Sequence, residues 1–262
     1  MSNAQIGVVV PTLNSASTLQ WTLCSLRSQR NVTQEIIVAD SGSDDGSLDI
    51  CKNWGIKTIY VTPGNMYRAI NAGLNQIDSE WVTYLNSDDT VYPDSYARLV
   101  SHGERQSASL VYGDCDFVDY EGRFLFTVKS PPASGLSGMV RSSPLFGGRI
   151  GFAQPAAIYR RSTFQELGGF DEQYSNIADY DFFFRLVTSG RVVAKLPRPG
   201  VAAFRLHGAQ LSVRRAANLQ EELRSFRKTL SVRTSPKDLL EVISWRLRNS
   251  PTYVSRLMRL RP

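Results

Sequence analysis

The chain has 262 residues, 42% of them hydrophobic, which suits one large α/β domain with an appended segment and excludes a chain that is disordered throughout. Its three cysteines, Cys24, Cys51 and Cys115, show no C-x-x-C spacing, which argues against a zinc cage or a disulfide framework. The net charge of +6 is uneven, because residues 214–262 hold twelve Lys or Arg against four Asp or Glu, a net +8, which leaves −2 elsewhere.

The first strand is expected over residues 6–10, a continuous apolar and β-branched run that is typical of a strand buried on both faces of a parallel sheet. We expect Pro11 to end it. A helix capped by Ser15 or Ser17 follows, with leucines at helical spacing. The loop between them lacks the glycines that a dehydrogenase or P-loop site needs, which excludes those two classes.

Two further strands, each followed by a helix, are expected over residues 35–39 and 57–61. This alternation predicts a parallel sheet with right-handed crossovers. Asp40 ends the first of these strands, where ligands of open α/β sheets bind, and it is either a turn residue or an acceptor for a base or ribose. Arg68 lies in the first turn of the second helix, where a cation opposes the helix dipole unless it faces an anion.

The fourth strand, residues 81–85, is followed by two adjacent carboxylates, Asp88 and Asp89. Neighbouring like charges repel each other unless a cation or a loop amide compensates. Hard cations such as Mg²⁺ bind carboxylate oxygens and complete their shell with substrate phosphates. An acidic turn at this edge of the sheet therefore favours a metal site, with a plain turn or helix cap as the alternative.

In the second half of the chain, the regular patterns of strands and helices are interrupted more often. A helix is expected from residue 95 to about 106, and Ser162 is expected to cap a short helix that two glycines end. Strands are expected at residues 109–112, 123–128, 154–161, 192–196 and 201–206. Residues 129–149 are rich in Pro, Gly and Ser, which predicts a functional loop without a long regular element.

Three further residues are candidates for chemistry. Asp179 and Asp181 fall in the first turn of a helix, where the dipole favours negative charge. Capping would explain one of them, and either is also a candidate catalytic base. His207 follows the last strand, a position that favours a ligand or phosphate contact, although a single His is more often a packing or surface residue.

Taken together, these stretches resemble the family 2 glycosyltransferases with a GT-A fold, a group that builds bacterial surface polysaccharides among other products. The resembling stretches are residues 10–14, 39–46, 68–73, 85–89, 168–171, 179–186 and 205–207. The resemblance implies one α/β domain over residues 1–213, with a mostly parallel central sheet flanked by helices. Its nucleotide-binding half runs to about residue 113 and its acceptor-binding half covers residues 114–213, followed by a basic helical extension over residues 214–262.

The resemblance also implies an activity, namely transfer of a sugar from a nucleoside diphosphate sugar, with UDP-sugar favoured, to a hydroxyl of a carbohydrate or glycolipid acceptor, with inversion and with Mg²⁺ or Mn²⁺. The residues implied for the nucleotide sugar are Pro11, Thr12, Asn14, Asp40, Arg68, Asn86 and Ser87. Those implied for the metal are Asp88, Asp89 and His207, and the catalytic base is Asp179. Asn86 and Ala178 stand where relatives often have acidic residues, which places more weight on Asp88 and Asp179.

Two other functions stay open. A nucleotidyltransferase that makes the nucleotide sugar shares this type of sheet, but it uses a glycine-rich first loop with a basic residue, which residues 11–14 do not supply. A nucleotide-sugar-binding or scaffold protein without catalysis is consistent with Asn86 and Ala178.

The basic extension, residues 214–262, interleaves apolar residues with arginines, as amphipathic helices that rest on anionic lipid do. Packing on the catalytic domain or in a homo-oligomer is equally open. Few aromatic residues and no recognition motif argue against nucleic acid. No basic apolar leader begins the chain, and no stretch reaches the roughly 18 apolar residues of a spanning helix, so we expect a cytoplasmic protein, with the inner membrane face as a candidate location.

Overall fold

The computed structural model describes residues 5–142, 150–208, 216–229 and 235–250. Its first half contains β1 (Ile6–Thr12), α1 (Ala16–Arg27), β2 (Gln34–Asp40), α2 (Ser47–Asn53), β3 (Lys57–Tyr60), α3 (Met66–Leu74), β4 (Trp81–Tyr84), β5 (Thr90–Val91), α4 (Ser95–Gln106) and β6 (Leu110–Tyr112). Its second half contains β7 (Cys115–Val118), β8 (Phe124–Val128), α5 (Ala133–Ser142), a 3₁₀ turn (Gln154–Ala156), β9 (Ala157–Arg160), α6 (Arg161–Glu166), α7 (Ala178–Thr188), β10 (Val193–Lys195), β11 (Ala202–Arg205), α9 (Ala216–Thr229) and α10 (Pro236–Arg248).

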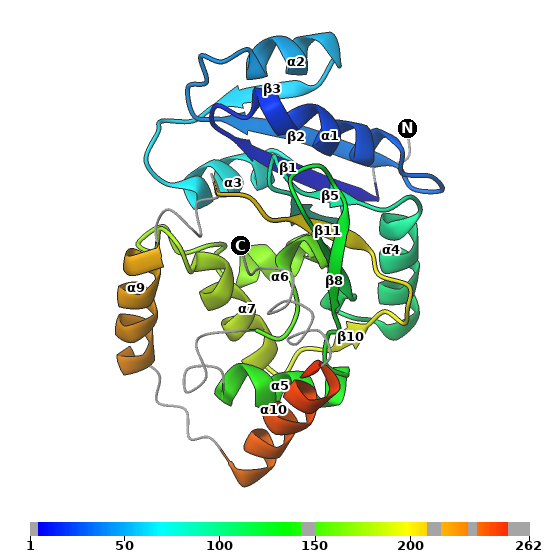
Figure 1. Ribbon diagram of the computed structural model, residues 1–262, viewed down its shortest axis with the longest axis vertical. Coiled ribbons are helices and arrows are strands. Elements are labelled where there is room, and N and C mark those ends of the chain that lie inside the picture. Colours follow the sequence, from blue (N-terminus) through cyan, green and yellow to red (C-terminus); the bar gives the residue numbers. More distant parts are fainter. Residues whose placement is uncertain (1–4, 143–149, 209–215, 230–234, 251–262) are drawn as a thin grey trace.

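A seven-stranded sheet of order β10-β6-β9-β4-β1-β2-β3 forms the centre of the molecule (Figure 1). Strands β3, β2, β1 and β4 pair in parallel, and so do β10 and β6. Strand β9 runs antiparallel to both of its neighbours. The expected α/β class, with a mostly parallel central sheet flanked by helices, is confirmed.

A second sheet, of order β5-β11-β7-β8, was not expected from the sequence. Strand β11 pairs antiparallel with β5 and parallel with β7. Because β5 is only two residues long, its sequence carries no alternation that could be recognised as a strand. This pairing places His207, which follows β11, beside the turn that follows β4.

The hydrophobic core lies on both faces of the main sheet. All seven residues of β1 are buried, with Val9 on one face and Val8 and Val10 on the other. Helices α3 and α7 pack on the Val9 face, and helices α1 and α4 pack on the opposite face. Such two-sided burial is what a continuous β-branched run predicts.

Strand β1 continues through Pro11 to Thr12, so the expectation that Pro11 ends the strand is wrong. Pro11 lies opposite Ala39 of β2. On the other side, pairing with β4 stops at Val9 and Tyr84. The missing N–H of Pro11 therefore removes no hydrogen bond of the ladder at this point.

Helix α5 forms within residues 129–149, where no long regular element was expected. Helix α10 packs directly on it. Gly138 permits this close approach, because a Cβ at this position would lie 3.2 Å from the Cα of Asp238. This tertiary contact outweighs the low helix propensity of a Gly- and Ser-rich segment.

The expected cap of α6 is also corrected. This helix begins at Arg161 with Arg160 at the N-cap position and no side-chain cap, so Ser162 lies inside the helix. In the part of the C-terminal extension that the structure describes, two helices pack on the preceding residues, α9 beside α7 and α10 beside α5 (Figure 1). Among the described residues, no helix is both long and apolar enough to cross a membrane.

Candidate active site

The loops after β1 and β2 are tied together at the carboxyl edge of the main sheet. Asn14 adopts a left-handed φ of 49°, which asparagine tolerates. Its amide oxygen accepts the N–H of Asp44 at 3.0 Å, and its own N–H donates to the Ser43 hydroxyl at 2.9 Å. Thr12, 4% exposed, ends β1 directly before this loop.

Asp40 is buried at the end of β2, and its carboxylate organises the loop that follows. One oxygen accepts the N–H groups of Gly42 and Ser43 at 2.8 and 3.0 Å, and the other accepts the Ser43 hydroxyl. A carboxylate has about four acceptor positions, so Asp40 can still receive one donor from a ligand.

Asp45 caps two helices at once. Its carboxylate accepts the N–H of Ala16 at the start of α1 at 2.8 Å and the N–H of Ser47 at the start of α2 at 3.0 Å. Ser15 occupies the expected N-cap position of α1, but its hydroxyl donates to the carbonyl of Leu13 instead of capping the helix.

The turn after β4 holds two carboxylates in different surroundings. Asp89 is fully buried; its carboxylate accepts the backbone N–H of Arg205 at 2.9 Å and the amide of Asn86 at 3.2 Å. Burial, with the neighbouring charge of Asp88, raises the pKa of Asp89 well above its ordinary value. The carboxylate of Asp89 therefore lies on the inner side of the turn, where hydrogen bonds to other protein groups hold it in place.

Asp88 lies at the surface of the same turn. Its carboxylate is 2.9 Å from Nε2 of His207, and the two side chains are 21% and 16% exposed. Ser87 donates its hydroxyl to that of Ser15 at 2.8 Å, which joins the turn to the start of α1. The structure therefore brings Asp88 and His207 together, although they are 119 residues apart in the chain.

A divalent cation fits the chemistry of this turn. The amide oxygen of Asn86 is buried without a hydrogen-bond partner, and its orientation is set because the amide nitrogen donates to Asp89. With a carboxylate and an imidazole it gives an oxygen and nitrogen donor set that suits Mn²⁺ or Mg²⁺. Within the described ranges, no group of three or more His, Cys, Asp or Glu side chains could hold a metal by itself.

Arg205 was not expected among the site residues, and it holds the acidic turn in place. Its Nε donates to the carbonyl of Asp88 at 2.9 Å and its Nη1 to that of Tyr120 at 2.6 Å. The guanidinium carbon lies 4.4 Å from the ring centre of Trp21. A charged residue at the end of the otherwise apolar β11 was the sequence signal for this role.

Asp179, at the start of α7, faces two tyrosine hydroxyls. Tyr67 donates to it at 2.8 Å and Tyr84 at 3.4 Å, and the N–H of Tyr180 adds a bond of 2.8 Å. Burial raises the pKa of Asp179 above its ordinary value, although these hydrogen bonds act in the opposite direction. Burial and the charge of Asp179 also raise the pKa values of both tyrosines, so they remain donors.

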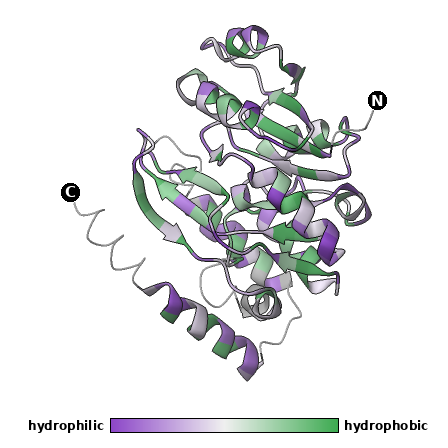
Figure 2. Ribbon diagram, turned by 90° about the vertical axis from the view of Figure 1, so that its right-hand side faces the viewer, coloured by the Kyte–Doolittle hydropathy of each residue, from purple (hydrophilic) through white to green (hydrophobic). Residues whose placement is uncertain are grey.

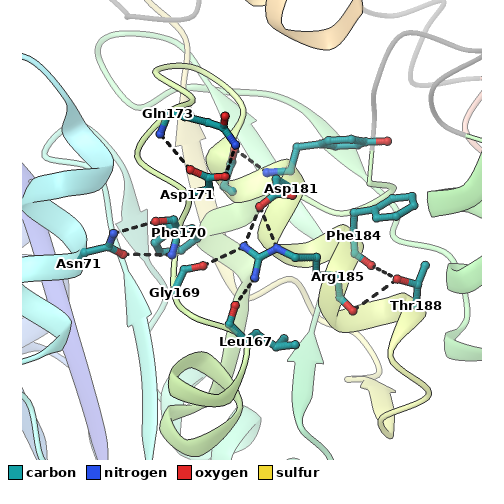
Figure 3. Close-up of polar contacts among 12 residues, drawn as sticks. Asn71, Leu167, Gly169, Phe170, Asp171, Gln173, Asp181, Phe184, Arg185 and Thr188 are labelled. Atoms are coloured by element: carbon teal, nitrogen blue, oxygen red, sulfur yellow. Dashed lines mark hydrogen bonds and ion pairs between the residues drawn. The ribbon is translucent and has the colours of Figure 1, made fainter. Parts of the chain in front are cut away.

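Asp181 has a different partner. It is 8% exposed and binds Arg185 through two hydrogen bonds of 2.9 and 2.7 Å. Arg185 in turn donates to the carbonyls of Leu167 and Gly169, which ties α7 to the end of α6 (Figure 3). This network favours Asp179 over Asp181 as the candidate base.

The remaining predicted residues connect these groups. The Nε of Arg68 donates to Glu172 at 3.2 Å, in the segment that leads to α7, and both side chains are about half exposed. Tyr84 ends β4 just before the acidic turn and also contacts Asp179. Tyr84 thus connects the candidate metal-binding turn to Asp179, the candidate catalytic base. Tyr67 and Tyr84 carry no motif and could not be identified from sequence.

Comparison with known proteins identifies the family. The sequence model described as "Glycosyl transferase family 2" matches residues 7–168. A "PGL/p-HBAD biosynthesis glycosyltransferase" of Mycobacterium bovis is 29% identical over 216 residues, which cover 79% of each protein. An uncharacterized glycosyltransferase of Rickettsia conorii is 25% identical over 69% of this chain and 31% of its own length.

Solved structures share the fold at lower identity. S. aureus TarS has a TM-score of 0.66 and 18% identity over 92% of this chain, which spans 43% of the TarS chain. The mannosyltransferase PcManGT of Pyrobaculum calidifontis, in complex with GDP-Man and Mn²⁺, has a TM-score of 0.66 and 17% identity, covering 94% of this chain and 70% of its own. The fold is therefore of the GT-A type, and the chain belongs to glycosyl transferase family 2 and is a glycosyltransferase.

Proposed function

We propose that the chain is a metal-dependent, inverting glycosyltransferase that transfers a sugar from a nucleoside diphosphate sugar, with UDP-sugar favoured, to a hydroxyl of a carbohydrate or glycolipid acceptor in surface polysaccharide or glycolipid synthesis. The observation that carries this proposal is the contact of Tyr84 with Asp179, because Tyr84 directly precedes the turn where Asp88 contacts His207. The TarS structure with UDP-GlcNAc and the PcManGT structure with GDP-Man and Mn²⁺ support donors of this class.

The donor would lie along the carboxyl edge of the main sheet. We place the nucleoside against Pro11, Thr12, Asn14 and Asp40, where Asp40 has an acceptor position left for a base N–H or a ribose hydroxyl. Asn86 and Ser87 would contact the donor at the end of β4. Arg68, at the first turn of α3, would supply a cation near the diphosphate once it leaves Glu172.

The metal would bind at the acidic turn. We propose Asp88 and His207 as protein ligands, with the unpartnered amide oxygen of Asn86 as an additional donor. The resemblance also implied Asp89 as a metal ligand. We propose instead that Asp89 stabilises the turn, because both of its oxygens accept hydrogen bonds inside the protein. When bound, Mg²⁺ or Mn²⁺ would neutralise the charge that develops on the leaving diphosphate.

Asp179 would act as the general base. The acceptor oxygen attacks C1 of the donor sugar, the bond from C1 to the diphosphate oxygen breaks, and the acceptor proton moves to a carboxylate oxygen of Asp179. A pKa raised by burial suits this role, because it makes the carboxylate of Asp179 a stronger base. Tyr67 and Tyr84 would hold the carboxylate in one orientation.

The test begins with thermal unfolding of the protein in the presence of UDP, dTDP and GDP, each with and without Mn²⁺. We expect at least one nucleotide to raise the melting temperature, and Mn²⁺ to increase that shift, because a ligand that binds only the folded state stabilises it by mass action. No shift with any nucleotide would contradict the proposal.

The second part of the test separates catalysis from binding. With the matching nucleotide sugar and a panel of glycan and glycolipid acceptors, we expect acceptor-dependent release of the nucleoside diphosphate. Binding without release would favour a nucleotide-sugar-binding or scaffold protein. Formation of a nucleotide sugar from nucleoside triphosphate and sugar phosphate would favour a nucleotidyltransferase. We also propose that the protein is cytoplasmic and contacts the inner face of the membrane.

A further inference from the structure

Helix α10 has two faces of opposite environment. Val242, Trp245 and Asn249 are 4%, 6% and 3% exposed on the face toward the domain. Leu240, Ile243 and Leu247 are 65%, 50% and 68% exposed on the other side. Spacings of three and four residues place these last three on one side of a helix. They form an outward apolar stripe on α10, the helix that runs along the lower edge of the molecule in Figure 2.

The orientation of this apolar stripe is fixed by the buried face. Ser235 and Asp238 form a capping box at the start of α10. Trp245 donates its indole N–H to the carbonyl of Lys129 at 2.7 Å, and Asn249 exchanges hydrogen bonds of 3.0 and 3.1 Å with the same residue. The helix therefore cannot roll to bury the apolar stripe without losing these bonds.

Cations flank the apolar stripe. At 100° per residue, Lys237 and Arg248 lie along one side of it and Arg246 along the other, and all three are exposed. The two acids of α10 are directed elsewhere, since Asp238 is buried in the capping box and Glu241 packs beside Gly135 of α5. The outward side of α10 is thus apolar at its centre and positive at its edges.

We propose that this side of α10 is a docking surface for an anionic lipid bilayer. Helices of this type lie in the plane of the interface, with the apolar stripe among the headgroups and the cations on lipid phosphates. Residues 251–262 lie outside the described residues, and their sequence holds Arg256, Arg259 and Arg261 among apolar residues. A second copy of the chain is a poorer occupant, because residues 214–262 carry a net +8 in each copy, and two such segments repel.

This docking surface deepens the acceptor part of the proposed function and rests on it for its purpose, since a glycolipid acceptor is presented at a membrane. Its test needs neither donor nor acceptor. Failure of lipid binding would leave sugar transfer to a soluble glycan intact, and failure of sugar transfer would leave lipid binding intact. The two proposals can therefore be refuted separately.

The experiment is flotation of the full-length protein with phosphatidylcholine vesicles that contain or lack phosphatidylglycerol. We expect wild type to float with the anionic vesicles. The variant L240Q/I243Q/L247Q should bind at least about tenfold more weakly, because it removes the side chains that enter the interface. The variant K237Q/R246Q/R248Q should lose the preference for anionic vesicles.

A matched control replaces three exposed apolar residues elsewhere, in the variant L48Q/Y60Q/V192Q. It should float like wild type, and all variants should melt within a few degrees of wild type, because every replaced side chain is exposed. Wild type that stays with the unbound protein would overturn the proposal, and so would equal flotation of the two apolar variants. Dimerisation of wild type that L240Q/I243Q/L247Q abolishes would assign the surface to a second copy instead.

Discussion

The tasks are divided within each of the two acidic segments of the site: one carboxylate stabilises the structure and the other is the candidate for chemistry. In the turn after β4, Asp89 is held inside the protein by Arg205 and Asn86, whereas Asp88 contacts His207 near the surface. At the start of α7, Asp181 is held by Arg185, whereas Asp179 receives neutral tyrosine hydroxyls. In each pair one carboxylate stabilises the loop or helix that presents the other. Neighbouring acids in a sequence therefore need not share a function, because burial and partner decide it.

The largest expected effect is on turnover at α7. The substitution Asp179→Asn should lower kcat by about 10²–10⁴, because it removes the proton acceptor while keeping the shape of the side chain. Donor affinity should stay within a few-fold of wild type. The pKa of Asp179 is raised in the folded state, so its ionised form opposes folding at neutral pH, and the variant should melt no lower than wild type. Unchanged kcat would remove Asp179 from the mechanism.

The opposite pattern is expected for Asp181. The substitution Asp181→Asn removes the negative charge that pairs with Arg185 and weakens both hydrogen bonds. It should cost about 2 kcal/mol of unfolding free energy, less than a fully buried pair because Arg185 is partly exposed. The kcat of the folded variant should remain within a few-fold of wild type. Denaturant unfolding and steady-state kinetics, run beside Asp179→Asn, measure both. A loss of kcat as large as that of Asp179→Asn would remove the distinction between the two acids.

An intermediate effect is expected from helix α9, which supports the segment before α7. Glu222 accepts the N–H groups of Ser175 and Asn176 at 3.0 and 2.9 Å and the Asn176 side chain at 2.8 Å. Glu222→Ala should therefore lower kcat about tenfold with little change in the donor KM, because Asp179 is less well positioned. The neighbouring Glu221→Ala, on an exposed side chain, is the matched control. Equal kcat in the two variants would show that α9 does not position the base.

The smallest effect concerns pH. Asp179 must be ionised to accept a proton, so activity should fall as pH decreases through its raised pKa. Tyr67→Phe removes a hydrogen bond that favours the ionised form, which should move this acid limb upward by about one pH unit. The control is Tyr159→Phe, since the buried Tyr159 hydroxyl has no hydrogen-bond partner. An acid limb that does not move in Tyr67→Phe, or that moves downward, would contradict the assignment.

The fold could be anticipated where the information is local. Strands β1, β2 and β4 contain short apolar runs, and β3 is a short, mostly exposed edge strand. Helical patterns separate these strands, so their parallel order follows from sequence. Strand β5 has two residues and forms only because β11 pairs with it. The contact between Asp88 and His207 depends on that pairing, and residues 119 positions apart leave no local signal for it.

The candidate site, like the fold, could be predicted only where the information is local. Nearby acids marked both segments, and the resemblance placed more weight on Asp88, but the inward role of Asp89 depends on its burial and on the contacts of Arg205, which have no local signal in the sequence. Tyr67 and Tyr84 read as core residues of α3 and β4, and their hydroxyls reach Asp179 only after both elements pack on α7.

The most direct test of this division of tasks is calorimetric titration of the stabilising nucleoside diphosphate with and without Mn²⁺, in wild type and in Asp88→Asn. We expect Mn²⁺ to tighten nucleotide binding to wild type by about tenfold or more, because a bound ion would add favourable interactions with the diphosphate. Asp88→Asn should bind the nucleotide with the affinity that wild type shows without metal, and Mn²⁺ should change nothing. An Asp88→Asn variant that keeps the full Mn²⁺ effect would contradict the proposed role of Asp88 as a metal ligand.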